Sequence, residues 1–318
     1  MKCLRELSLP LLLLALVSSI AGVPESLGQS TNSNSCCLKI DMAIEGSAVF
    51  TVSDLSTNAS GPFDLFFRTN LSDAQGWTWL LRLSLGQTNL ILNNVPAGQG
   101  FYMLGLTNAI RSGFDQNALP PEDDDPSMNT PLPLVMNFYG IASSNVWVNN
   151  NGNVTFDSPQ SAYTPSSLST IKARIIAPFW ADVDTRNPQS DVVRYGTNVV
   201  DGHAAFGVDW VNVGYYSGHA DRQLSCQLVI IDRSDILPGN FDMEFNYMKV
   251  QWEWGDVSVG NPPRAGFSDG INDIELPGSG VEGAFLDTNA VTGLIYNSLK
   301  SPVPGRYIFN FRNGQPLP

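Results

Sequence analysis

The chain has 318 residues, of which only 15% are charged, and it contains 28 glycines and 21 prolines. This composition is typical of turn-rich β proteins, since charged residues make up about 25% of an average soluble protein. The formal net charge of -13 provides no basic surface for a phosphate backbone. Nucleic acid and anionic membrane surfaces are therefore excluded as expected partners.

The first residues predict a signal peptide over residues 1–21. Two basic residues precede an apolar run over 9–17, and small residues follow up to Ala21. This is the three-part pattern of a secretory signal. The run is also shorter than the roughly 20 residues that a membrane-spanning helix needs. We therefore expect cleavage near Ala21 and a secreted chain with no integral membrane segment.

The next part of the chain predicts a leader followed by a small β domain. Residues 22–40 are rich in Ser, Asn and Gln, and we expect them to form a disordered leader. Over residues 41–112, short apolar runs alternate with turn residues, which predicts a small antiparallel β-sandwich. Its expected strands are Ala43–Val52, Phe63–Arg68, Thr78–Leu83, Asn89–Val95 and Gly100–Leu106.

An acidic, proline-rich segment follows. Two prolines precede the acidic run from Glu122 to Asp125, a composition typical of a solvated linker. We interpret residues 113–133 as this linker and place the domain boundary here. Cation binding by the run is the weaker alternative, because consecutive like charges in an extended chain are held apart from one site.

Residues 134–312 carry the clearest strand patterns, and residues 313–318 are interpreted as a C-terminal tail. The pair Asn151-Gly152 separates two apolar-rich runs and predicts a tight hairpin, because it supplies the positive φ that such a turn requires. Other patterns predict an antiparallel pair from 224–231 and 241–247, and a closing strand with Tyr307, Phe309 and Phe311 on one face.

Several segments of residues 134–312 resemble, in order, the nidogen-like (NIDO) domain. The most specific of them is Ile176–Arg186. The others are Phe138–Gly140, Val146–Phe156, Gln227–Ile231, the region of Phe245–Tyr247 and Gln251-Trp252, Ala265–Phe267, Leu276–Ser279 and Pro304–Phe309. The resemblance implies an extracellular module associated with cell–matrix adhesion and without assigned catalytic residues. It thus implies a secreted, non-catalytic adhesion or matrix-binding or cell-surface-binding protein, with an extracellular protein or glycan as ligand.

The candidate metal ligands are Asp182, Asp184 and Asn187, which follow a predicted strand. Carboxylates at positions i and i+2 of an extended chain face the same side, and clustered oxygens suit Ca²⁺. The loop offers fewer oxygens than the six to eight that calcium takes. The structural alternative is that the aspartates accept hydrogen bonds from turn amides and pair with Arg186, so that the loop joins the ends of the sheet. No other cofactor is expected.

We do not expect an enzyme. The chain has two histidines, His203 and His219, and no phosphate loop or dinucleotide fingerprint. The alternative is a carbohydrate-binding protein or glycoside hydrolase that uses Asp182/Asp184 and the stretch Trp252-Glu253-Trp254. Trp252 and Trp254 are candidate ligand-binding residues. In a strand, however, both indoles would be buried on one face with Glu253 exposed on the other.

Three cysteines remain after the signal, which is too few for a complete disulfide framework. Cys226 alternates with Leu224 and Leu228, so we expect it to be a buried core thiol. A bridge from Cys226 to Cys36 or Cys37 is the alternative.

Overall fold

The computed structural model describes residues 13–17, 37–44, 47–53, 64–68, 78–83, 89–93, 100–105 and 109–318. These residues form β-strands and one short 3₁₀ helix, η1 (Leu168–Thr170), and no α-helix occurs among them. The expected all-β class is confirmed. Among the described residues no helix has the length and apolar character needed to cross a membrane. The chain divides into two compact units, residues 1–107 and 108–318.

Unit 1 contains two antiparallel sheets. A four-stranded sheet has the order β1-β7-β4-β5 and is formed by β1 (Leu13–Val17), β4 (Asp64–Arg68), β5 (Thr78–Arg82) and β7 (Gly100–Gly105). A three-stranded sheet has the order β2-β3-β6 and is formed by β2 (Cys37–Ile44), β3 (Ser47–Ser53) and β6 (Asn89–Asn93).

Two expectations for unit 1 differ from the structure. The stretch Ala43–Val52 was expected as one strand, but it belongs to the antiparallel pair β2 and β3. A Glu45-Gly46 pair separates these strands in the sequence, and such a pair favours a turn. The expected signal peptide and leader lie outside the described residues, apart from β1 and the start of β2, and both stay predictions.

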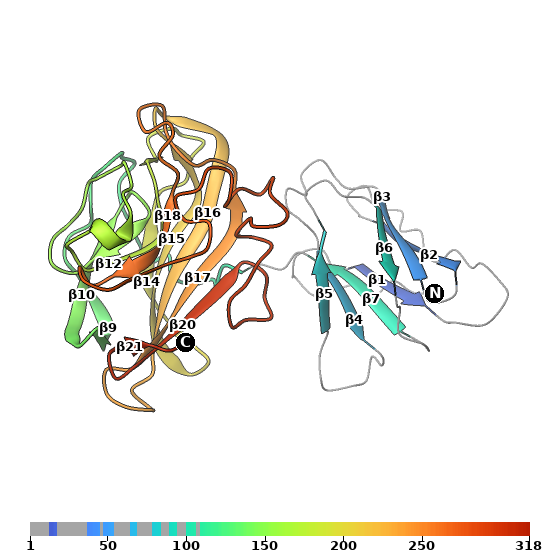
Figure 1. Cartoon of the computed structure of the whole chain (residues 1–318), viewed down its shortest axis with the longest axis horizontal. Helices are drawn as coiled ribbons and strands as arrows, with labels where there is room; N and C mark the ends of the chain where they lie inside the picture. The colour runs from blue at the N-terminus through green and yellow to red at the C-terminus, as the bar shows by residue number, and fades with distance from the viewer. Residues whose placement is uncertain are drawn as a thin grey trace. The chain divides into compact units, whose positions relative to one another are not determined.

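Unit 2 contains two further antiparallel sheets, which pack against each other as a sandwich (Figure 1). The smaller has the order β19-β18-β12-β11-β10-β9, formed by β9 (Thr130–Phe138), β10 (Ile141–Asn149), β11 (Asn153–Thr155), β12 (Ile175–Trp180), β18 (Arg264–Ser268) and β19 (Asp273–Glu275). The larger has the order β21-β20-β17-β16-β15-β14-β8, with β13 also paired to β15. Its strands are β8 (Asn117–Ala118), β13 (Val183–Asp184), β14 (Arg194–Val200), β15 (His203–Tyr215), β16 (His219–Asp232), β17 (Phe241–Val250), β20 (Arg306–Arg312) and β21 (Gln315–Pro316).

The main core of unit 2 fills the space between these two sheets. On β20, Tyr307, Phe309 and Phe311 are buried and alternate with less buried neighbours, so the expected closing strand is confirmed. The ring of Phe311 lies 5.4 Å from that of Phe138 on β9 and 5.4 Å from that of Phe267 on β18. Aromatic contacts at this distance join the two sheets directly.

The two expected hairpins are also confirmed. β10 and β11 pair across a turn in which Gly152 has a φ of 73°, and β16 pairs antiparallel with β17. Cys226 on β16 is a fully buried free thiol, as expected, and burial raises its pKa well above the ordinary value. The side chains of the two N-terminal cysteines, at positions 36 and 37, lie outside the described residues.

The expected linker is instead part of unit 2. β8 pairs with β14, the backbone N–H of Leu119 donates to the carbonyl oxygen of Val193 (2.9 Å), and Glu122 is only 7% exposed. Phe114 packs in a second apolar cluster with Val200, Ala205, Val229 and Ile231. The last two residues alternate along β16 with residues of the main core, so this cluster lies on the opposite face of the large sheet. The segment is ordered here because it covers that apolar face, and the unit boundary therefore falls near residue 107.

Two arginines outside this segment bind polar residues of β17. Arg111 donates to both carboxylate oxygens of Glu244 (2.7 and 2.9 Å), and Arg306 donates to Asn246 Oδ1 (3.0 Å). Glu244 and Asn246 are buried. The expected C-terminal tail also differs, because β21 pairs with β20 and so extends the large sheet.

Candidate functional site

The site begins where β12 ends. Every residue of β12 is buried, and the chain then turns through Asp182 and Asp184, which are 1% and 0% exposed. Two carboxylates are therefore placed at the end of an apolar strand with almost no contact with solvent. Buried charges of this kind need partners, because an unpaired buried carboxylate is strongly unfavourable.

An asparagine-rich turn, defined here as residues 149–153 and called the Asn turn, holds this segment in place. The carbonyl oxygen of Gly152 accepts a hydrogen bond from the N–H of Phe179 (3.2 Å), and Asn151 Oδ1 accepts one from the N–H of Val183 (2.9 Å). Asn150 Nδ2 donates to the carbonyl oxygen of Val183 (2.7 Å). The Asn turn thus satisfies backbone groups where the strand becomes irregular.

The Asn turn also binds the acidic loop, defined as residues 122–125. Asn150 Nδ2 donates to the carbonyl oxygen of Asp123, and Asn151 Nδ2 donates to Asp124 Oδ1 (2.8 Å). On the other side, three hydrogen bonds join Thr185 and Glu122. The N–H and Oγ1 of Thr185 donate to O of Glu122 (2.8 and 3.0 Å), and the N–H of Glu122 donates to Oγ1 of Thr185 (2.9 Å). These contacts fix the acidic loop against the segment that follows β12.

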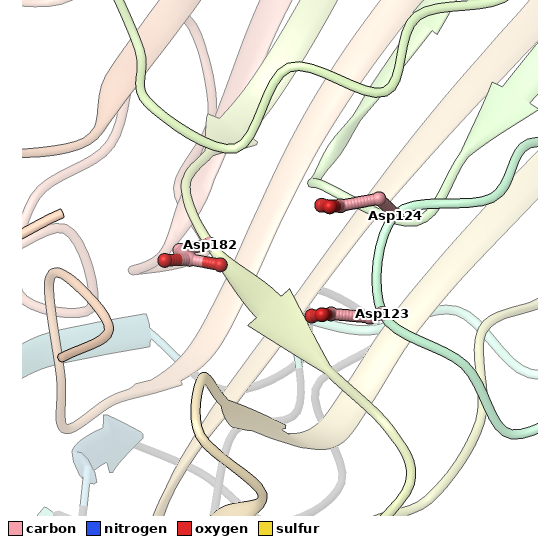
Figure 2. Close-up of side chains that lie close together, drawn as sticks. All are labelled: Asp123, Asp124 and Asp182. Atoms are coloured by element: carbon pink, nitrogen blue, oxygen red, sulfur yellow. The ribbon is translucent and has the colours of Figure 1, made fainter. Parts of the chain in front are cut away.

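As a result, three carboxylates converge. One oxygen each from Asp123, Asp124 and Asp182 lies within 4.8 Å of the others. Figure 2 shows the first two, on the acidic loop, directed toward the third across the gap between the two segments. A pocket of about 210 Å³ lies beside them, lined by Asp123, Asp124, Tyr163, Asp182, Tyr216 and Val257.

Three carboxyl groups in and beside this carboxylate cluster have raised pKa values. Burial raises the pKa of Asp182 to about 6, and the charges of Asp123 and Asp124 add to the effect, whereas a hydrogen bond from Ser258 opposes it. Burial and the charge of Asp124 likewise raise the pKa of Asp123 to about 6. For Glu122, burial and the neighbouring aspartates raise the pKa to about 7, while the amide of Asp125 lowers it. Negative charge is thus concentrated at the pocket and only partly compensated.

Asp184 has a different environment from Asp182. Arg186 donates to both of its carboxylate oxygens (Nε to Oδ1, 2.9 Å; Nη2 to Oδ2, 2.5 Å), and the N–H of Gly218 donates to Oδ2 (2.8 Å). Burial acts to raise the pKa of Asp184, but these hydrogen bonds outweigh burial and hold the pKa below its ordinary value. Asn187 bonds the carbonyl oxygen of Gly218 through Nδ2 (2.7 Å) and the N–H of Gln189 through Oδ1 (2.8 Å).

Of the three metal ligands that the sequence suggested, the structure therefore places one, Asp182, in the carboxylate cluster. Asp184 accepts hydrogen bonds from turn amides and pairs with Arg186, as the structural alternative described, and Asn187 also joins turns through its own hydrogen bonds. Asp123 and Asp124 were missed as neighbours of Asp182 because the run was interpreted as a linker. The asparagines of the Asn turn could have indicated this contact, because their side-chain donors need acceptors once the turn is buried.

The predicted tryptophan platform is not formed. The stretch 252–254 is a loop rather than a strand, because β17 ends at Val250. Trp252 is 1% exposed and packs in the core, with its ring 5.7 Å from that of Phe179 and 5.5 Å from that of Tyr215, so it offers no face to a ligand. Glu253 is also buried, and its carboxylate accepts hydrogen bonds from the N–H of Gly283 (3.0 and 2.9 Å). Trp254 is half-buried.

A second pocket, of about 280 Å³, contains another acid with an altered pKa. Burial raises the pKa of Asp209 to about 6, and Asp115 adds to this, while a hydrogen bond from Gln227 Nε2 (2.7 Å) lowers it. A folded-state pKa above the unfolded value means that the folded state binds the proton more tightly. The contribution of Asp209 to stability is therefore present below pH 4 and lost as the pH rises through about 6.

We expect the substitution Asp209→Asn to remove this pH dependence. Urea unfolding gives the free energy of unfolding at pH 4.5 and 7.5. Between these two pH values, the free energy of unfolding of wild type should fall by on the order of 1–2 kcal/mol more than that of the variant. Asp191→Asn, an exposed acid that lines the same pocket but does not contribute to the pKa shift of Asp209, serves as the control and should leave the difference between the two pH values nearly unchanged. Equal pH dependence in wild type and Asp209→Asn would contradict the assignment.

Comparison with known proteins gives one family and a small set of relatives. A family model described as the nidogen-like domain matches residues 144–313. Alpha-tectorin of Mus musculus is 29% identical over 221 residues, which cover 60% of this chain and 10% of that protein. Alpha-tectorin of Homo sapiens is 28% identical over 221 residues, with the same shares. The chain thus spans about a tenth of the length of these curated relatives. No solved structure gives a significant match.

Proposed function

The chain belongs to the nidogen-like domain family, and from this premise we propose that it is a secreted, non-catalytic, matrix-type binding protein. The observation that carries the proposal is the family match over residues 144–313, which covers most of the sandwich of unit 2. The predicted signal peptide supports the extracellular location. We propose that the ligand is an extracellular protein, because several loops of unit 2 expose apolar side chains.

Two of the acids named for the glycoside hydrolase alternative are engaged elsewhere. Asp184 is paired with Arg186, and Glu253 binds the backbone of Gly283. A glycosidase needs two acids on either side of a bond in an open cleft. Sugar binding would also need an accessible aromatic face, and Trp252 is buried. A protein ligand fits these contacts better than a sugar substrate does.

The exposed apolar side chains gather in one part of the sequence. Within the described residues, six of the fourteen large apolar side chains that are exposed lie between β17 and β20. Five are on loops, namely Val257, Val259, Ile271, Val281 and Val291, and Ile274 is on β19. The contact between Glu253 and Gly283 ties two of these loops together. Exposed apolar groups on fixed loops suit a protein partner, because their burial drives association.

We expect the purified full chain to bind at least one matrix protein saturably in a solid-phase assay against a panel of purified matrix proteins and glycans. The double variant Val259→Ser/Val281→Ser should weaken that binding by about tenfold or more, which corresponds to about 1.4 kcal/mol. Val199→Ser, an equally exposed valine on β14, is the matched control and should bind like wild type.

Two results would count against the proposal. One is a folded chain that binds no member of the panel. The other is release of sugar from a glycan by the chain, with loss of that activity in Asp182→Asn, which would support the enzyme alternative.

A further inference from the structure

We propose that Asp123, Asp124 and Asp182 together bind a Ca²⁺ ion, which ties the acidic loop to the segment that follows β12. The ligand set joins two parts of the chain that are far apart in sequence. It shares only Asp182 with the set that the sequence suggested. The inference does not depend on the proposed function, since an ion could stabilise the site whatever the chain binds.

The donor atoms define the class of ion. All three side chains offer carboxylate oxygens, and no histidine or cysteine belongs to the cluster. Hard oxygen donors suit Ca²⁺ or Mg²⁺ rather than zinc or copper. The oxygens lie within 4.8 Å of one another. Two oxygens on opposite sides of a calcium ion, each at about 2.4 Å, are about 4.8 Å apart, whereas the smaller Mg²⁺ would draw them closer together.

Independent support comes from buried oxygens that have no partner. Asp182 is 1% exposed, and the structure gives its carboxylate one hydrogen bond, from Ser258 Oγ to Oδ2 (2.9 Å). Among the described residues no donor is hydrogen-bonded to its Oδ1, and the side chain lines the pocket. Asp123 Oδ1 is also buried without a hydrogen-bond partner. Buried polar atoms of this kind are normally satisfied by protein, water or an ion.

The nearby cation does not fill this role. Arg186 Nη2 lies 3.1 Å from Asp123 Oδ2, but its guanidinium is already engaged with both oxygens of Asp184. Among the described residues, no other arginine or lysine forms an ion pair with the carboxylate cluster. Three carboxylates therefore share part of one positive charge, and a divalent cation would compensate the rest.

The surroundings also fit an ion with a partly hydrated shell. Calcium takes six to eight oxygens, and three carboxylates supply between three and six of them. The pocket of about 210 Å³ leaves room for several waters at about 30 Å³ each. The Asn turn already fixes the acidic loop through Asn150 and Asn151, so little ordering of the chain is needed when the ion binds.

The test is a calcium titration of the full secreted chain after removal of divalent ions with a chelator. Isothermal titration calorimetry should show one site with a Kd of about 10⁻⁴ to 10⁻³ M, the range of extracellular calcium modules. Calcium at about ten times that concentration should raise the melting temperature by several degrees, and magnesium at the same concentration should raise it less.

Matched variants distinguish a specific calcium site from general attraction of the ion to acidic residues. Asp124→Asn keeps an oxygen that can accept the hydrogen bond from Asn151, so it should fold while binding calcium at least about tenfold more weakly. Asp125→Asn removes one charge from the same run, but its side chain is exposed and outside the cluster. It should bind calcium nearly as well as wild type.

Terbium luminescence gives a second measurement that does not depend on thermal stability. Tyr163 and Tyr216 line the pocket, so excitation of tyrosine should sensitise emission from bound Tb³⁺, and calcium should displace it. Asp182→Asn should lose this signal. The proposal is overturned if wild type shows no calcium-dependent heat, melting shift or displaceable emission, or if Asp125→Asn weakens binding as much as Asp124→Asn does.

Discussion

Replacing Gly152 with alanine is expected to lower the free energy of unfolding of unit 2 by about 3 kcal/mol or more. Gly152 has a φ of 73°, a conformation that L-residues with a side chain rarely adopt. A Cβ at this position would also lie 1.7 Å from the carbonyl oxygen of Phe179. The substitution therefore pushes the Asn turn away from β12, and the measurement is chemical unfolding of the purified chain.

Gly202→Ala separates the two causes of this loss. Gly202 has a φ of 87°, but a Cβ there would meet nothing within 4 Å. Its substitution should cost only the conformational part, about 1–2 kcal/mol. If Gly152→Ala is no more destabilising than Gly202→Ala, then the close packing of the Asn turn on β12 is not a feature of the folded protein.

Removal of the buried carboxylate in Glu244→Ala is expected to destabilise unit 2 by about 3 kcal/mol. Glu244 is 3% exposed and accepts two hydrogen bonds from Arg111, and Arg306 lies 3.6 Å away. Without the carboxylate, the two guanidinium groups lose the buried ion-pair partner that they share, and only the weaker influence of the charge of Asp201 acts on both of them. The segment around Arg111 should then detach from the large sheet, which limited proteolysis near residue 111 would detect.

The matched control is a surface ion pair. Asp235 pairs with Arg233 at 3.0 Å, but its side chain is 45% exposed. Asp235→Ala should leave the unfolding transition almost unchanged, because solvent screens exposed pairs. Equal effects of Glu244→Ala and Asp235→Ala would show that the segment around Arg111 is not anchored by the buried pair.

The parts of the fold that the sequence predicted correctly depend on local chemistry. Asn151-Gly152 specifies its hairpin because only a few residues adopt the required φ, and the alternation of Tyr307, Phe309 and Phe311 specifies a buried face. Both signals lie within a few residues of the element they define. The expectation of one strand over Ala43–Val52 was wrong, because apolar residues continue on both sides of Glu45-Gly46 while β2 ends at Ile44 and β3 begins at Ser47.

The site was harder to predict because its contacts join distant segments. Period-two alternation places Glu244 and Asn246 on one face of β17, but it does not say whether that face meets solvent. It is Arg111, 133 residues earlier, that covers them. In the same way, the acidic loop has a composition typical of a linker, and the donors that fix it come from Asn150 and Asn151, 27 residues later.

The acidic loop should be a fixed part of unit 2, and amide hydrogen exchange tests this directly. The N–H groups of Leu119, Glu122 and Ser127 are hydrogen-bonded to Val193 O, Thr185 Oγ1 and Val148 O. They should exchange as slowly as amides in the neighbouring strands β10 and β14. Exchange of these three amides at the rate of an unstructured peptide would contradict the account.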